Sequence, residues 1–312
     1  MTGFDTGGDG AAAAAADAAT DPADEPPVVV KIGGAKAVDP AGAVGDVAHL
    51  AANGRRVVVI HGGSTVVDET IERLGMEPEY VESASGVTGR FTDAETMEAF
   101  TMAMAGKLNT ELTARFREAG VDAVGLSGVD GGLLSGPRKS AVRVVEDGKK
   151  KIRRGEHSGR IESVNAGLLS GLLDDGYTPV VSPPMEGKES DGGVTAVNTD
   201  ADRAAAAVAG ALGADLVLLT DVAGVYADPD DPDTLIESAA TPDELAAVEG
   251  AAEGFMGKKV MAAKEALSGG AGRVVVADAN VNDPLVAALG GAGTTIERSA
   301  VAERAETGGE TA

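Results

Sequence analysis

The chain of 312 residues contains no cysteine and no tryptophan, and only three histidines. Without cysteine it forms no disulfide bond, thiolate metal site or thiol nucleophile, so these classes of chemistry are excluded. The histidines are His49, His61 and His157. So small a number argues against a histidine metal cluster, and we predict no metal site built from protein side chains.

Basic residues are also scarce, with 26 Lys and Arg against 50 Asp and Glu, which gives a formal net charge of −24. This balance argues against nucleic acid and anionic membranes as partners for the surface as a whole, because both are themselves negative. The acid excess, the small apolar residues and an aromatic content of 3% are typical of the cytoplasmic proteins of extreme halophiles. A merely acidic surface fits the same composition.

Long apolar runs are missing too, and none approaches the length of a membrane span. The alanine run at residues 11–16 has acids on both sides and no basic segment before it, which excludes a signal peptide. Residues 1–27 carry six acids and no base. We therefore predict a disordered acidic tail there, a similar tail at residues 300–312, and a cytoplasmic location.

Strand and helix signals alternate along the rest of the chain. Apolar runs predict strands at Val28–Ile32, Arg56–Ile60, Val121–Leu126, Thr178–Val181, Asp215–Leu219 and Arg273–Val276. Helices are predicted between them, among others at Ala41–Asn53, Thr92–Glu118, Ser163–Asp174, Thr199–Leu212 and Met256–Ser268. This alternation predicts an α/β fold with a mostly parallel sheet covered on both faces, and ligands at the carboxyl ends of the strands.

Local signals predict where some elements begin and end. Thr92 and Glu95 have the spacing of a capping box, and a Thr-Pro-Asp-Glu sequence at 241–244 predicts another helix start. Residues 142–145 and 151–154, joined around an Asp-Gly pair, predict a hairpin. The Pro- and Gly-rich segment 182–194 is interpreted as a boundary between two lobes.

Two of the apolar strands open into paired glycines, Gly33–Gly34 and Gly62–Gly63. Glycines at the carboxyl end of a strand let backbone N–H groups approach an anion closely. Lys31 flanks the first loop, and the second leads into a helix at Ser64, whose N-terminus also favours negative charge. Two such loops predict a phosphoryl-transfer site. The alternative is that the glycines only make strand-to-helix turns.

Two further segments carry polar side chains ahead of helices. Arg90 lies in a loop before the long helix and is able to hold a carboxylate through two parallel hydrogen bonds. Alternatively it is a surface arginine that bonds a helix carboxylate. Asn198, Asp200 and Asp202 precede the alanine-rich helix, where they either serve a site or cap that helix.

Another two segments lie in the second half of the chain. Thr220, Asp221 and Tyr226 follow the most apolar strand, a good position for a nucleotide, although Thr-Asp and Gly are also ordinary turn formers. Lys258 and Lys259 lie at a predicted helix start, where cations oppose the helix dipole. A bound anion would offset that cost, so the two lysines predict an anion nearby.

In this order, the segments resemble the amino acid kinase superfamily, and within it the N-acetylglutamate kinase branch, over about residues 28–298. The resemblance implies a three-layer αβα sandwich with a mostly parallel central sheet. It implies an acyl-acceptor lobe at residues 28–181 and a lobe for ATP with Mg²⁺ at residues 182–299. The implied reaction phosphorylates a side-chain carboxylate to an acyl phosphate, and the implied assembly is a homodimer.

The resemblance also implies a role for each matching residue. Lys31 and Lys259 would act on the transferring phosphoryl group, and Asp202 would orient both. Four glycines (Gly33, Gly34, Gly62, Gly63) would donate backbone N–H groups to phosphate and carboxylate oxygens, Arg90 and Asn198 would hold the substrate's α-carboxylate, and Thr220, Asp221 and Tyr226 would lie at the nucleotide. Because a carboxylate nucleophile is already ionised, catalysis would rest on positioning and charge neutralisation.

Three positions depart from the family's pattern. Ser64 stands where a further glycine is usual, and Asp200 stands where an asparagine is usual. The match to Lys258 or Lys259 is ambiguous by one position, and we align Lys259 because Val260 follows it.

The segment Lys149–Arg160 carries six Lys and Arg against one acid, in a chain of net charge −24. Burial of so much charge is costly, so the segment is expected to be exposed. It either balances local acids or receives an acidic macromolecule. With the Arg90 loop and Ser64, it resembles kinases that act on glutamate or α-aminoadipate attached to an acidic amino-group carrier protein of the LysW type. Lys150, Lys151, Arg153 and Arg154 are the predicted carrier-binding residues.

Three hypotheses follow from these patterns. The first is the kinase for carrier-linked glutamate or α-aminoadipate. The second is a kinase for free N-acetylglutamate, which needs no basic patch. The third is a regulatory module without catalysis, which would be expected to lose the lysines, Asp202 or the glycine loops, whereas all of these are present.

Overall fold

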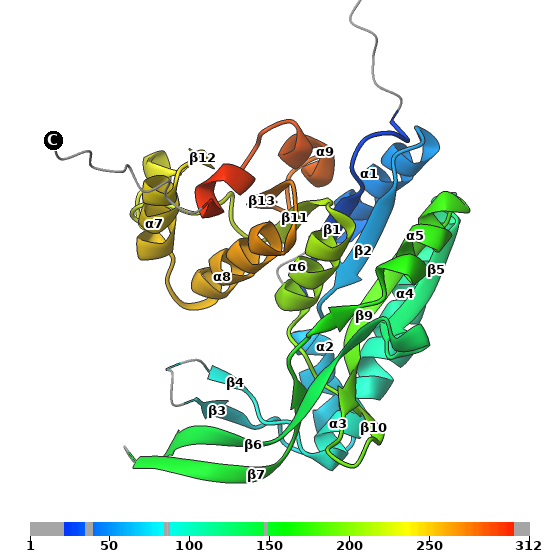
Figure 1. The fold of residues 1–312 in the computed structure, drawn as a ribbon, viewed down its shortest axis with the longest axis vertical. Helices are drawn as coiled ribbons and strands as arrows, with labels where there is room; N and C mark the ends of the chain where they lie inside the picture. Colours follow the sequence, from blue (N-terminus) through cyan, green and yellow to red (C-terminus); the bar gives the residue numbers. More distant parts are fainter. Residues whose placement is uncertain (1–21, 35–39, 84–85, 87, 147–148, 303–312) are drawn as a thin grey trace, which may run out of the picture.

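The computed structural model describes residues 22–34, 40–83, 86, 88–146 and 149–302 (Figure 1). Most of both predicted acidic tails lies outside these ranges. Within them, Glu25 forms an ion pair with Arg55, Pro27 is buried, and Ala300 is buried in a short 3₁₀ turn, Arg298–Val301. The fold therefore extends on both sides beyond residues 28–299.

A 12-stranded, mostly parallel sheet runs through the described part of the chain. Its order is β12 (Ser238–Ala239), β14 (Thr294–Glu297), β13 (Arg273–Asp278), β11 (Asp215–Thr220), β1 (Val28–Ile32), β2 (Val57–His61), β9 (Thr178–Lys188), β6 (Leu134–Glu146) and β7 (Lys149–Gly159). Three more strands pair off this path, β5 (Ala123–Gly128) and β10 (Val194–Val197) with β9, and β8 (Ser163–Val164) with β6. The pairs from β13 through β11, β1 and β2 to β9 are parallel, which confirms the predicted fold class.

Helices cover both faces of this sheet (Figure 1). One face packs against α1 (Pro40–Ala52), α4 (Asn109–Glu118) and α9 (Pro284–Leu289), and the other against α5 (Ala166–Asp174), α6 (Ala201–Leu212) and α8 (Gly254–Gly269). Side chains of a strand alternate between faces, so Val28, Val30 and Ile32 join the first core and Val29 the second. The same alternation turns Lys31 toward the α6 face.

The remaining helices are α2 (Ser64–Arg73), α3 (Ala94–Thr101) and α7 (Pro242–Ala251). A third apolar cluster, which includes Val67, Ile71 and Phe100, joins α2 to α3. Among the described residues, no helix has both the length and the apolar character that a membrane span requires.

Helix ends agree only in part with the sequence. The capping box at Thr241 is present. The predicted Thr92–Glu95 capping box is wrong, because Asp93 caps α3 by accepting the Thr96 N–H at 2.8 Å. The helix predicted from Ser163 begins three residues later, because Asn165 caps α5 and the residues before it form β8.

The long helix predicted over 92–118 contains a π-helical segment, Met102–Leu108, between α3 and α4. A π-helical turn inserted in an α-helix is rare, and no local signal in this sequence predicts it.

The segment 182–194, predicted to be a boundary between two lobes, is strand for about half its length: β9 continues through it to Lys188, and β10 returns antiparallel. Its two prolines lie at an irregularity in the ladder, where Ser127 pairs with Ser182 and Gly128 with Met185. Proline lacks the N–H that a regular ladder needs, and a bulge removes that requirement. A division at residue 181 would cut this strand, and the roles assigned to two lobes stay predictions.

Two hairpins project from the same end of the molecule (Figure 1). One is β6–β7, longer than predicted, whose turn at 147–148 lies outside the described residues. The other is β3 (Tyr80–Glu82) with β4 (Thr88–Arg90), for which the local sequence gives no hairpin signal. A bridge between Ser83 and Val144 joins them.

Candidate active site

Two lysines from distant parts of the chain converge on one carboxylate. Lys31 Nζ of β1 lies 2.8 Å from Asp202 Oδ1, and Lys259 Nζ of α8 donates to Asp202 Oδ2 at 3.1 Å. The side chains are 8%, 12% and 11% exposed for Lys31, Lys259 and Asp202. The structure thus brings together the three residues predicted to be catalytic.

Burial and charge act in opposite directions on these groups. Burial alone would raise the pKa of Asp202, but the ammonium groups of Lys31 and Lys259 outweigh it and hold that pKa below its usual value. For Lys259, burial and then the neighbouring Lys31 lower the pKa, against the attraction of Asp202. Two cations around one anion leave an excess positive charge, which suits an anionic ligand.

The two glycine loops touch one another beside this triad. A Cβ on Gly34 would lie 1.9 Å from the Gly63 nitrogen, so only glycine fits there. The Gly62 N–H donates to the Ile32 carbonyl at 3.0 Å, which ties the second loop to the end of β1. Gly33 directly follows β1. The two glycine loops therefore pack together at the carboxyl edge of the sheet.

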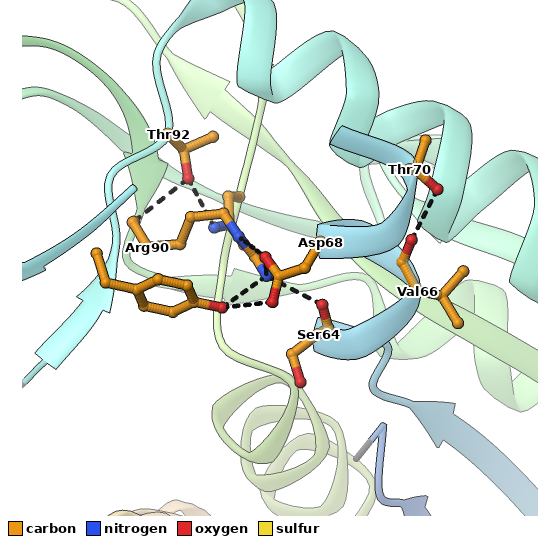
Figure 2. A network of polar contacts seen from close by, with 8 residues as sticks. Ser64, Val66, Asp68, Thr70, Arg90 and Thr92 are labelled. Carbon is orange, nitrogen blue, oxygen red and sulfur yellow. Dashed lines mark hydrogen bonds and ion pairs between the residues drawn. The ribbon is translucent and has the colours of Figure 1, made fainter. Parts of the chain in front are cut away.

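Arg90 lies in a polar network on α2 (Figure 2). Its Nη2 donates to Asp68 Oδ1 at 2.7 Å and to the Ser64 carbonyl at 3.1 Å, and its Nε donates to the same Asp68 oxygen at 3.2 Å. Tyr80 adds a phenol oxygen 3.0 Å from Nη2. These contacts agree with the alternative interpretation of Arg90, in which it bonds a helix carboxylate. The Arg90 side chain is only 7% exposed, however, and so is not at the surface.

Asn198 lies at the other end of the same network. Its Nδ2 donates to Thr92 Oγ1 at 3.0 Å, and Thr92 Oγ1 lies 3.5 Å from the Arg90 carbonyl. The Thr92 N–H faces the carboxylate of Glu156 at 3.4 Å, and burial raises the pKa of that carboxyl. Thr92 thus connects the two residues predicted to hold the α-carboxylate. Asp200 caps α6 by accepting the Arg203 N–H at 3.0 Å.

The residues predicted at the nucleotide lie at the end of β11. Lys31 pairs in register with Leu218, so Thr220 lies two residues nearer the carboxyl edge on the neighbouring strand. Thr220 Oγ1 donates to the exposed Asp221 at 3.1 Å, and Tyr226 is half-buried and bridges to Leu235. Their position fits a nucleotide at this edge, and their contacts are also those of an ordinary loop.

The basic hairpin presents one charged face to solvent. Opposed residues in an antiparallel pair share a face, and Ile152 opposes Arg143 while Arg154 opposes Ala141. We name this the outer face of the hairpin: Arg143, Lys150, Ile152 and Arg154, all exposed, with Ile152 at 65%.

Arg153 differs from the other predicted carrier-binding residues. It pairs with Glu79, and its guanidinium lies 3.9 Å from the centre of the Phe91 ring. Lys151 shares this inner side of the strand. Arg153 therefore holds the hairpin against the loop between β4 and α3, a role that its position in a basic run does not reveal.

Lys258, the lysine next to Lys259 in the sequence, has a different partner. Its Nζ donates to the Thr88 carbonyl of β4 at 2.9 Å and lies 5.3 Å from the centre of the exposed Phe255 ring. Of the two lysines, Lys259 contacts Asp202, in agreement with the alignment on Lys259, whose catalytic role stays a prediction. Within the described residues, no group of three or more His, Asp or Glu is arranged to hold a metal ion.

Residues 26–278 match the model of the amino acid kinase family. The chain belongs to this family. Two relatives are [LysW]-aminoadipate kinases: that of Deinococcus radiodurans is 44% identical over 270 residues, covering 86% of this chain and 91% of the relative, and that of Thermus thermophilus is 40% identical, covering 86% and 99%. The acetylglutamate kinase of Methanopyrus kandleri is 43% identical over 222 residues, covering 70% and 84%.

Solved structures agree with the fold of this amino acid kinase. An N-acetylglutamate synthase from Neisseria gonorrhoeae matches with a TM-score of 0.63 and 27% identity, covering 87% of this chain, and the chain spans 59% of that synthase. The carbamate kinase of Giardia lamblia bound to AMP-PNP has the same TM-score at 18% identity and covers 88% and 99%, which shows the fold. The chain is an ATP-using kinase of this family.

Proposed function

We propose that this kinase transfers the γ-phosphoryl group of ATP to the side-chain carboxylate of glutamate or α-aminoadipate, with that amino acid attached to an acidic carrier protein of the LysW type. The product is an acyl phosphate for arginine or lysine biosynthesis. The proposal includes a homodimer that works in a cytoplasm of high salt.

The basic hairpin is the observation that carries the proposal. The outer face of the hairpin gathers three cations and an exposed isoleucine on a chain of net charge −24. It projects beside β3–β4, next to the Arg90 network (Figure 1). A large acidic substrate would gain both attraction and contact there, whereas a small free amino acid would use neither. The names of the relatives from Deinococcus radiodurans and Thermus thermophilus agree with such a substrate.

The chemistry needs positive charge more than it needs a base. The acceptor carboxylate is ionised at neutral pH, so it attacks phosphorus without losing a proton. Lys31 and Lys259 would stabilise negative charge on the phosphoryl oxygens, and Asp202, which contacts both ammonium groups, would hold them in place. Backbone N–H groups of the glycine loops and of the first turn of α2 would add further donors.

Mg²⁺ is proposed to enter with ATP as part of the nucleotide substrate. Both oxygens of Asp202 face a lysine, and the described residues offer no acidic cluster for a protein-bound ion. Phosphate oxygens and water would therefore supply the ligands that Mg²⁺ prefers.

Free N-acetylglutamate is the second candidate, favoured by the acetylglutamate kinase of Methanopyrus kandleri among the relatives. For a glutamate acceptor, the two candidates differ only in what masks its amino group.

Trapping of the acyl phosphate distinguishes the two candidates. The kinase is incubated at high KCl with ATP, hydroxylamine and one of three acceptors: carrier-linked glutamate, carrier-linked α-aminoadipate or free N-acetylglutamate. Hydroxylamine converts an acyl phosphate into a stable hydroxamate, which mass spectrometry detects. We expect a hydroxamate on a carrier-linked acceptor. A hydroxamate from free N-acetylglutamate alone would favour the second candidate, and none from any acceptor would contradict both.

A further inference from the structure

His61 is a buried histidine that the proposed reaction does not use. It is the last residue of β2, it directly precedes Gly62 and Gly63, and it is 3% exposed. Burial lowers the pKa of His61 to about 4, so at neutral pH the imidazole is neutral and carries one ring proton.

The partners of His61 decide where that proton lies. Nδ1 is 3.1 Å from the Gly62 carbonyl oxygen, which can only accept, so the proton is on Nδ1. Nε2 then accepts from Asn109 Nδ2 at 3.2 Å. The other amide hydrogen of Asn109 is directed at the Val180 carbonyl, 2.8 Å away. Each donor in this chain thus meets an acceptor, and both side-chain orientations are determined.

Asn109 is the first residue after the π-helical segment Met102–Leu108. That segment packs directly on the second glycine loop. A Cβ on Gly63 would lie only 2.3 Å from Leu108 Cδ1 and 2.5 Å from Met104 Sδ. On the other side, the Asn109 Oδ1 lies 2.4 Å from the position of a Cβ on Gly125. Two glycines therefore make room for the π segment and for the amide that follows it.

We infer that His61 and Asn109 are positioning residues, which fix the Gly62–Gly63 peptide so that the N–H groups at the start of α2 face the transferring phosphoryl group. Glycine has the widest backbone freedom of any residue, so a diglycine loop needs an external constraint. Gly63 is the N-cap of α2 and has no side chain with which to cap it. Donors held in place before the reaction stabilise the transition state without reorganisation. The inference rests on phosphoryl transfer at this site and not on the identity of the acceptor.

The test uses His61→Leu, His61→Asn and Asn109→Leu, with His49→Leu at an exposed histidine of α1 as the matched control. We expect His61→Leu and Asn109→Leu to lower kcat by about tenfold or more, the loss of one well-placed hydrogen bond, while KM for ATP and acceptor changes less than about threefold. His61→Asn should keep more of kcat than His61→Leu, because its amide can still donate to the Gly62 carbonyl. The assay uses whichever acceptor the wild type phosphorylates, so it stands if the carrier proposal fails.

A binding measurement separates positioning from general destabilisation. ADP with aluminium fluoride mimics the transferring phosphoryl group, and ADP alone does not. In calorimetry, the variants should bind ADP with aluminium fluoride about tenfold more weakly than the wild type does. Their affinity for ADP alone should stay within about twofold of the wild-type value. Equal affinities of wild type and variants for the mixture, or equal losses for ADP and the mixture, would overturn the inference. If His61→Leu does not fold, the same comparison of ADP with and without aluminium fluoride is made on His61→Asn.

Discussion

Lys31 on strand β1 lies 2.8 Å from Asp202 on helix α6, although each residue belongs to a different layer of the fold. Strand alternation turns the Lys31 side chain toward α6, and the cap at Asp200 fixes where that helix begins. Asp202 lies in the first turn of α6, where the helix dipole stabilises a carboxylate. The position of this ion pair is therefore set by strand β1 and helix α6, each of which has its own local structural determinants.

Substitution of either lysine should abolish most of the catalysis. We expect Lys31→Ala and Lys259→Ala each to lower kcat by roughly 10²-fold or more with little change in substrate binding, because charge on the phosphoryl oxygens grows in the transition state. Lys264→Ala, on the same helix as Lys259 but paired with Glu249, is the control. Turnover near that of the wild type would remove the substituted lysine from the mechanism.

Asp202→Asn should destabilise the protein in a pH-dependent way. The variant leaves Lys31 and Lys259 buried together without an anion, at a cost of about 3–5 kcal/mol in the free energy of unfolding. The folded-state pKa of Asp202 is lowered, so its contribution is complete above the unfolded value of about 3.9 and is lost as pH falls through the folded value. Urea unfolding of both proteins should show a difference that is constant near neutrality and vanishes in acid. A difference that persists unchanged in acid contradicts this account.

Arg90→Lys tests the acceptor side of the site. A lysine cannot reproduce the contacts of Nε and Nη2 with Asp68 and the Ser64 carbonyl. We expect KM for the acceptor to rise by about tenfold, with KM for ATP nearly unchanged. Asp68→Asn should have the same effect if Asp68 positions Arg90. Steady-state kinetics with each substrate varied in turn would show the assignment to be wrong if the defect lay in ATP alone.

The hairpin should serve partner capture and not chemistry. Lys150→Glu with Arg154→Glu reverses two cations of its outer face and should raise KM for a carrier-linked substrate about tenfold at low salt, with kcat at saturation kept. Lys107→Glu with Lys264→Glu makes the same change of charge elsewhere and is the control. High salt should shrink the effect, since exposed charges are screened. Equal KM values for wild type and the Lys150/Arg154 variant, at the lowest salt at which both stay folded, would mean that the hairpin only neutralises nearby acidic residues.

Much of the fold follows from local sequence. Apolar runs such as Val28–Ile32 are buried on both faces, and the Thr241 capping box starts α7 as its spacing predicts. The prolines of 182–194 suggest a break in the sheet, but a strand continues through them. A strand accepts proline where the pairing with its neighbour is irregular, as it is here at Ser127 and Gly128 of β5. That irregularity is a tertiary property.

Within the site, residue types were predictable and their partners were not. Lys31, Asp202 and Lys259 are each visible as a charge next to a glycine loop or a helix start. Asp68 and Glu156 carry no such mark, since a single acid on a helix or strand is ordinary in a chain with 50 of them. Pairing of Arg90 with Asp68 or Arg153 with Glu79 joins elements distant in sequence, so only the fold reveals it.

The ratio of kcat/KM for carrier-linked acceptor to kcat/KM for free N-acetylglutamate tests the proposed function most directly. It is measured with one enzyme preparation, at high KCl and then at the lowest salt that keeps the protein folded. We predict a ratio of at least about 10² at high salt, larger at low salt, where the attraction of the outer face is less screened. A ratio near one would contradict the account, and a ratio that favours the free acceptor would also make free N-acetylglutamate the preferred substrate.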